Sequence, residues 1–390
     1  MKIRKIAALK VLSPSGDFYN SAVVSFDEKG VVVAVEENVE NLDSLSGVEY
    51  YDGVLMPGMV NGHCHLELSY LKDTMDEGNG LVEFIRRITS IRRDYTFEEQ
   101  QQKAMAEDRK MWSEGVQGLC DISNGEASFE AKRTSNLLYH TYAEYFNMPS
   151  DDEVEGYYAA AVKHIEPARE LGLSISQTPH SNYMVGDKMY LKSTDSERLS
   201  IHFMETPSEV EYFEKKGGMY DFVVECEMTP DFLHYGGHVE RLIGSLRADT
   251  PLLLVHCTMM TQEQLEAILG YFTDVTFVLC PRSNYFIERA TPPAMMLMKS
   301  GANVALGTDS LTSNHSLSMA AEIEMLLRDN PELPLGVALK WATLGGARGL
   351  KAENRIGSFE VGKSCGVVLL EGVNLKTLRP EGELSSRRIL

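Results

Sequence analysis

Residues 56–65 read Met56-Pro57-Gly58-Met59-Val60-Asn61-Gly62-His63-Cys64-His65, a Pro-Gly turn followed by a short apolar run that ends in two histidines. Alternate side chains of an extended segment lie on one face, so His63 and His65 are directed to one point at the end of a strand. Two neutral imidazoles at one point are suitable ligands for a metal ion, although a His pair also occurs in ordinary surface turns. Residues further along the chain distinguish these two interpretations.

The segment after this turn alternates short apolar runs with helical stretches. We expect eight strands, at residues 58–61, 116–122, 141–146, 173–178, 199–203, 251–256, 275–280 and 304–307. Two helix starts are explicit, because Thr206-Pro207-Ser208-Glu209 and Thr261-Gln262-Glu263-Gln264 both have the pattern of a capping box. Eight strand-then-helix units predict an α/β fold, a parallel (β/α)₈ TIM barrel over residues 57–354.

The two ends of the chain have strand signals of a different kind. Residues 22–26 and 31–35 are β-branched runs separated by a turn at Glu28-Lys29-Gly30, and residues 366–370 form a further apolar run. We expect residues 1–56 and 355–390 to pair into one small β-sandwich domain beside the barrel.

Composition restricts the kind of partner. The chain has 390 residues, 43% of them apolar, and its 37 basic and 57 acidic residues give a formal charge of −20. Such a charge repels nucleic acid and anionic membrane surfaces, so we expect a small-molecule substrate, no nucleic acid and no membrane. The six cysteines are scattered without a C-x-x-C pair, which favours reduced thiols in a cytoplasmic protein. The oligomeric state stays open, a homo-oligomer included.

Unusual polar residues cluster where the predicted strands end. In a barrel these ends meet on one face, so side chains far apart in sequence can converge there. Taken singly, each has an ordinary explanation, such as a buried core histidine, a helix-dipole glutamate or a turn aspartate. Their joint placement favours a shared function for His63, His65, His180, His202, Glu205, His256 and Asp309. His140, His164, His234 and His238 lie away from the strand ends and are interpreted as structural, while His315 stays undecided.

Three imidazoles and one carboxylate suit one divalent metal ion with a position left for water. We assign His63, His65, His202 and Asp309 as its ligands, with Zn²⁺ preferred and Fe²⁺ or Mn²⁺ compatible. The ion lowers the pKa of bound water toward neutrality and so produces a nucleophile.

The remaining residues of the cluster receive roles around that water. Glu205 lies three residues after His202, where it can bend over the water as general acid/base. His256 follows the next strand and can polarise the attacked centre or hold the water. His180 and Ser313 are better placed to contact the substrate.

Five motifs in this order resemble those of the amidohydrolase superfamily. They are His63-Cys64-His65, Thr178-Pro179-His180, His202-Phe203-Met204-Glu205, His256-Cys257 and Gly307-Thr308-Asp309-Ser310. They are most similar to its mononuclear branch, which includes cytosine and guanine deaminases, S-adenosylhomocysteine deaminases and triazine chlorohydrolases. His65-Leu66-Glu67-Leu68-Ser69 resembles the first-strand motif of aminodeoxyfutalosine deaminases, which favours an adenine-bearing nucleoside.

The resemblance implies a deaminase mechanism. Hydroxide attacks a ring carbon that bears an amino group, Glu205 protonates the adjacent ring nitrogen, and ammonia leaves with a proton passed through Asp309. His256 hydrogen-bonds the water or the intermediate. Binuclear relatives place a carboxylated lysine after the fourth strand, where this chain has Thr178-Pro179-His180, so one metal is implied.

Two other functions fit the same pattern. The same hydroxide can hydrolyse a cyclic amide or a chloro-heterocycle. A catalytically inactive, metal-stabilised binding barrel needs only the four ligands, and the presence of Glu205 and His256 argues against it.

Overall fold

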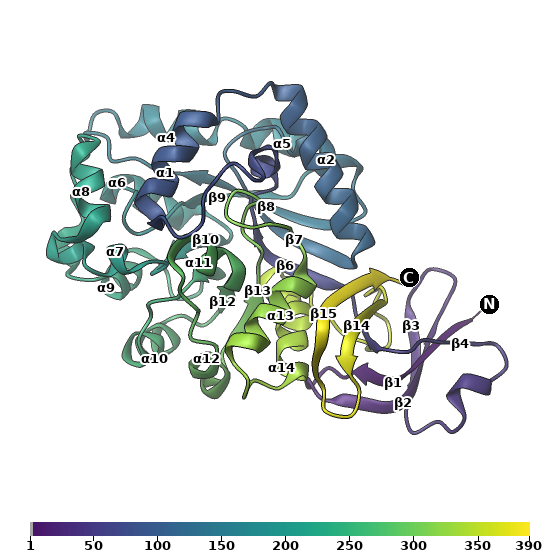
Figure 1. Cartoon of the computed structure of the whole chain (residues 1–390). Coiled ribbons are helices and arrows are strands. Elements are labelled where there is room, and N and C mark those ends of the chain that lie inside the picture. Colours follow the sequence, from purple (N-terminus) through teal and green to yellow (C-terminus); the bar gives the residue numbers. More distant parts are fainter. Residues whose placement is uncertain (1–2) are drawn as a thin grey trace.

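The computed structural model describes residues 3–390, and its central part consists of parallel strands and helices. The strands form two four-stranded sheets, in the orders β6-β7-β8-β9 and β10-β11-β12-β13 (Figure 1). Each of the eight strands overlaps one predicted from the sequence. Their bounds are Met59–Cys64 (β6), Val116–Ser123 (β7), Leu138–Tyr145 (β8), Ile175–Pro179 (β9), Leu199–Phe203 (β10), Leu252–His256 (β11), Val275–Leu279 (β12) and Asn303–Leu306 (β13).

The two sheets meet at two seams, and each seam contains one isolated bridge. Ser181 bridges to His202 between the ends of β9 and β10, and Cys64 bridges to Asp309 between β6 and the residues after β13. The predicted α/β domain with parallel strands is therefore confirmed, whereas its closure into one eight-stranded barrel is not shown. Both seams lie at strand ends that carry predicted site residues.

Helices follow the strands and surround the two sheets (Figure 1). The Thr261 capping box is present, with Thr261 and Gln264 capping each other at the start of α10. The predicted capping box at Thr206 is wrong. A helix begins after Thr206 as predicted, but the Thr206 side chain makes no cap hydrogen bond. The helices are Gly80–Ile91 (α1), Phe97–Ser113 (α2), Phe129–Thr134 (α3), Val154–Val162 (α4), Ile165–Glu170 (α5), Asp187–Tyr190 (α6), Pro207–Val210 (α7), Gly217–Glu225 (α8), His238–Ser245 (α9), Gln262–Tyr271 (α10), Pro281–Glu288 (α11), Ala294–Ser300 (α12), Met319–Asp329 (α13), Leu335–Lys340 (α14) and Gly346–Gly349 (α15). Among the described residues, none of these helices has both the length and the apolar character needed to cross a bilayer.

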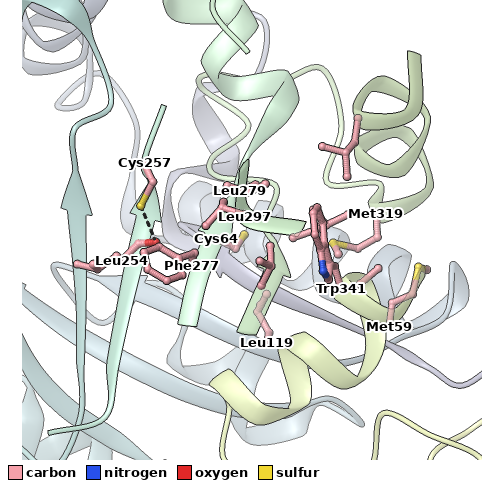
Figure 2. Packing of buried hydrophobic residues seen from close by; sticks show 14 of the residues in the cluster. Met59, Cys64, Leu119, Leu254, Cys257, Phe277, Leu279, Leu297, Met319 and Trp341 are labelled. Carbon is pink, nitrogen blue, oxygen red and sulfur yellow. Dashed lines mark hydrogen bonds between the residues drawn. The ribbon is translucent and has the colours of Figure 1, made fainter. Parts of the chain in front are cut away.

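Apolar strand residues pack against the helices in one large buried cluster. Figure 2 shows part of it, with Leu254 and Phe277 of β11 and β12 near Leu279 and Leu297. Cys257 also belongs to this cluster, and its thiol donates to the Leu254 carbonyl oxygen at 3.4 Å. Burial of this apolar surface stabilises the ends of the strands on which the site residues lie.

Strands from both ends of the chain form a third sheet at one side of the molecule, purple and yellow in Figure 1. Its order is β15-β14-β5-β1-β2-β3, with β4 also paired to β1, so the pairing of the two termini is confirmed. A two-sheet sandwich and the domain boundaries stay predictions. The strands are Arg4–Leu12 (β1), Phe18–Phe26 (β2), Val32–Glu36 (β3), Val48–Tyr50 (β4), Val54–Met56 (β5), Val368–Asn374 (β14) and Arg379–Arg388 (β15).

Candidate metal centre and active site

The two histidines of the opening motif lie at the end of β6 and are buried. Their Nε2 atoms are 3.2 Å apart, as expected for alternate residues of an extended segment. Asn61 holds this strand end in place, because its amide donates to Thr308 Oγ1 at 2.7 Å and its Oδ1 accepts from Thr308 N at 3.1 Å. The pair therefore has a fixed position relative to the chain after β13.

His202 brings a third imidazole to the same point from β10. Its Nε2 lies 3.3 Å from Nε2 of His65, and its Nδ1 lies 3.0 Å from the carbonyl oxygen of His180. A carbonyl oxygen can only accept, so Nδ1 carries the proton and Nε2 keeps its lone pair toward the cluster. Burial lowers the pKa of both His65 and His202, which favours the neutral form that binds metals.

Asp309 supplies the carboxylate from the other side of the seam. Its Oδ1 lies 3.5 Å from Nε2 of His63 and 3.4 Å from Nε2 of His65. Its Oδ2 accepts hydrogen bonds from Ser283 Oγ at 2.6 Å and Ser313 Oγ at 2.8 Å. Burial opposes ionisation, but the adjacent His63 and His65 hold the pKa of Asp309 well below its usual range.

The donor set fits a divalent cation. His63 and His65 present Nε2 atoms to each other, and only one proton can lie between two such nitrogens. A cation near these atoms would satisfy the remaining lone pairs and balance the ionised Asp309 carboxylate. Three nitrogens and one carboxylate oxygen are the donors of a transition-metal site that keeps an open position.

Glu205 and His256 face each other beside this cluster. Asn284 Nδ2 donates to His256 Nδ1 at 3.2 Å, so the ring proton is on Nε2, which lies 3.7 Å from Glu205 Oε1. Burial, followed by the charges of Asp309 and Glu209, raises the pKa of Glu205 well above its usual value. Burial lowers the pKa of His256 to about 3. This raised pKa favours the protonated form of Glu205, which can act as a proton donor.

Three site residues have left-handed backbone conformations. Met204, His256 and Asp309 have φ values of 48°, 71° and 56°, each at or just after a strand end. Such conformations are costly for residues other than glycine and are retained where the surrounding structure requires them. They occur where the chain brings Glu205, His256 and Asp309 to the wall of one cavity.

A cavity of about 340 Å³ leads to these residues. Its inner end is polar and includes His65, His202, Glu205, His256 and Asp309. The lining also includes the apolar α1 side chains Leu81, Phe84, Ile85 and Ile88. The cavity can thus hold a molecule with a polar reacting end and an apolar body.

Of the two predicted substrate contacts, His180 lines the cavity and Ser313 does not. His180 lines the cavity and forms an ion pair with the buried carboxylate of Glu144, which outweighs burial and raises the pKa of His180. Ser313 is fully buried, is not among the lining residues and donates to Asp309. The Ser313 hydroxyl therefore contacts Asp309, a proposed metal ligand, and does not face the cavity.

The histidines interpreted as structural lie away from the cavity. His140 lies between Ser174 Oγ at 2.7 Å and Ser176 Oγ at 2.9 Å, and His238 Nε2 donates to the Glu209 carbonyl oxygen at 2.8 Å. The undecided His315 is exposed and pairs with Glu77 at 2.7 Å. Among the described residues, none of His140, His164, His234, His238 and His315 lines this cavity.

Several polar residues of the site were missed in the sequence. Glu144 lies near the end of β8 and contacts His180, so the rule that selected His202, a polar residue at the end of an apolar strand, would also have found it. Glu67 lines the cavity and accepts from Ser123 Oγ at 3.1 Å and Asn124 N at 2.8 Å. No sequence signal predicted these side-chain contacts.

The chain is similar to several known proteins. The sequence pattern of the amidohydrolase family matches residues 54–385. A 5-methylthioadenosine/S-adenosylhomocysteine deaminase from Caldanaerobacter subterraneus subsp. tengcongensis is 27% identical over 360 residues, covering 87% of this chain and 77% of that protein.

Two solved structures share the fold. The Helicobacter pylori aminofutalosine deaminase, in complex with methylthio-coformycin, has a TM-score of 0.77 and 23% identity, covering 94% of this chain and 92% of that one. The atrazine chlorohydrolase of Arthrobacter aurescens, complexed with zinc, has a TM-score of 0.71 and 17% identity, covering 96% and 90%.

Proposed function

Because the chain belongs to the amidohydrolase family, we propose that it is a metal-dependent hydrolytic deaminase of an adenosine-type nucleoside. One observation carries the proposal: the Glu205–His256 pair lines one cavity together with His65, His202 and Asp309. Family membership supports hydrolysis of a carbon–nitrogen bond. The relative that acts on methylthioadenosine and S-adenosylhomocysteine supports the adenosine-type substrate.

We assign the metal to His63, His65, His202 and Asp309, whose donor atoms converge at the seams between the two sheets. We favour Zn²⁺ because three imidazoles and a carboxylate suit it, while Fe²⁺ and Mn²⁺ accept the same donors. When bound, the ion supplies Lewis-acid chemistry that generates a nucleophile from water near neutral pH. A single ion is proposed, since the residues at the end of the fourth strand are Thr178-Pro179-His180, without the lysine that binuclear relatives place there.

The residues around the cluster divide the proton transfers. The Glu205 carboxyl group holds a proton, favoured by burial, and delivers it to the ring nitrogen next to the attacked carbon. Asp309 accepts one proton from the water and passes it to the departing amino group, while the proton left on the added hydroxyl returns to Glu205, so that water and amine become a carbonyl product and ammonia. His256 Nε2 donates a hydrogen bond to the oxygen that adds to the ring.

The rest of the cavity binds and orients the nucleoside. His180, held by Glu144, presents a hydrogen-bond donor at the polar end, and the α1 side chains exclude water along the apolar wall. In this proposal the two parallel sheets are the halves of one (β/α)₈ barrel. Residues 1–56 and 355–390 form the accompanying small domain.

The test is a substrate panel with purified protein and one equivalent of zinc. Ammonia release is measured from adenosine, 5′-methylthioadenosine, S-adenosylhomocysteine, aminopyrimidines and aminopurine bases, with Glu205→Gln as the inactive control. The expected result is turnover of at least one adenosine derivative by the wild type alone. No ammonia from the whole panel, with hydrolysis of a cyclic amide or chloro-heterocycle instead, would overturn the assignment.

A further inference from the structure

Glu209 is a buried carboxylate that lies on the first turn of α7, four residues after Glu205. The sequence pattern predicted that it closes a capping box with Thr206, but the carboxylate reaches further back along the chain. Its Oε1 accepts from Met204 N at 2.7 Å, and its Oε2 accepts from Glu205 N at 2.8 Å. Both carboxylate oxygens are therefore used to hold the two residues that lead into the proposed acid/base.

The backbone held in this way is strained. Met204 follows the last residue of β10 directly and has φ of 48°, a conformation that a methionine rarely adopts. Its carbonyl oxygen accepts from Met259 N at 2.9 Å, so Met204 is fixed at both its N–H and its carbonyl group. The reversal at Met204 determines the direction in which Glu205 leaves the strand.

The position of Glu209 is itself fixed from outside α7. His238, the first residue of α9, donates from Nε2 to the Glu209 carbonyl oxygen at 2.8 Å. Pro207 begins α7 with a restricted φ angle, which limits the conformations of the short helix. Glu209 is thus a rigid acceptor pair rather than a mobile surface carboxylate.

We propose that Glu209 is a positioning residue for the reaction, which holds the Met204–Glu205 backbone so that the Glu205 carboxylate stays directed at His256 and the metal centre. The inference rests on the proposed function, because it assigns Glu205 its proton-transfer role. The alternative is that Glu209 only stabilises the fold near α7. Both explanations predict some loss of stability, so stability alone does not separate them.

Glu209→Gln is the decisive variant because it keeps the shape and removes one acceptor. The amide NH₂ then faces a backbone N–H, and one of Met204 N and Glu205 N loses its partner. We expect kcat to fall by roughly 10–100-fold, the scale of a misplacement of about 1 Å, with KM changed by less than about threefold. Bound zinc should stay at one equivalent.

Asp108→Ala is the control for a buried carboxylate in α2, outside the site. Asp108 Oδ1 accepts from Ser135 Oγ at 2.6 Å and Tyr139 OH at 2.7 Å, so this replacement also leaves buried donors without their acceptor. It should lower the melting temperature without lowering kcat. Equal losses of kcat in both variants would overturn the proposal.

A double-mutant cycle separates a positioning role of Glu209 from a role in fold stability alone. If Glu209 acts through Glu205, adding Glu209→Gln to Glu205→Gln should reduce the residual rate by less than about twofold. The full 10–100-fold loss in that background would overturn the proposal. Glu209→Asp, which keeps both acceptor atoms on a shorter side chain, gives the same cycle if the glutamine variant is insoluble.

Amide hydrogen exchange tests the placement without activity. At least one of the Met204 and Glu205 amides should exchange about tenfold faster in Glu209→Gln, while Leu253 and Leu254 in β11 remain protected. Unchanged exchange at Met204 and Glu205 would refute the proposal that Glu209 fixes this backbone. If the wild type shows no deamination but either amide responds, the proposed function fails and the contact stands.

Discussion

Lys132 and Asp121 form an ion pair whose side chains are both fully buried, beneath the loop that follows His65. Nζ of Lys132 lies 2.6 Å from Oδ2 of Asp121, and Oδ1 of Asp121 accepts from Leu66 N at 2.8 Å. Lys132→Met removes the cation and leaves a buried carboxylate without its counter-ion. Breaking a pair of this kind costs about 3–5 kcal/mol, because the remaining charge is compensated neither by an opposite charge nor by water.

The companion variant Asp121→Asn/Lys132→Met isolates the charge. The asparagine oxygen still accepts from Leu66 N, so the double variant loses the ion pair but keeps the backbone contact. Replacing both members of a buried ion pair by uncharged residues often changes the stability little. We therefore expect the double variant to recover at least about 2 kcal/mol of the unfolding free energy lost in the single variant.

Unfolding of the zinc-loaded proteins in urea, followed by circular dichroism, measures both differences. The single variant should unfold at clearly lower urea than the wild type, with the double variant between them. Bound zinc, measured in parallel, shows whether the His65 segment is disturbed. If the double variant is no more stable than Lys132→Met, the unpaired charge is not the cause of the loss and the reasoning is refuted.

Three further outcomes are expected. Glu205→Gln should lower turnover by at least about 10²-fold with bound zinc unchanged, and undiminished turnover would exclude its acid/base role. Asp309→Ala should lower both zinc content, measured by mass spectrometry, and turnover. Burial lowers the pKa of His140 to about 3 from an ordinary 6.5, so the unfolded chain takes up this proton first and the wild type loses stability as pH falls through that window. His140→Gln should therefore show a smaller decrease in melting temperature between roughly pH 7 and pH 5 than the wild type, and an equal decrease would contradict this linkage.

The sequence predicted the strands and the convergence of the site because both follow from simple periodicity. Apolar runs of strand length give the positions of β6 to β13, and parallel strands place their carboxyl ends on one face. His202 and Asp309 were identified on this basis although 107 residues separate them (309 − 202). The structure brings both to His65.

Contacts that depend on side-chain conformation were not predictable in this way. Ser313, which was predicted to contact the substrate, donates to Asp309 Oδ2 at 2.8 Å, a contact that the sequence did not indicate. Glu209 was expected to cap its own helix but reaches back to Met204 and Glu205. A residue pattern states which groups are near in sequence, whereas packing decides which donor each oxygen meets.

The two parallel sheets share the proposed ligands equally. His63 and His65 come from the sheet that begins with β6, while His202 and Asp309 come from the sheet that begins with β10. Neither half of the molecule thus contains a complete set, and the chemistry exists only while the halves remain docked along both seams. Co-expression of two fragments divided between β9 and β10 would therefore make enzymatic turnover a direct reporter of their reassembly.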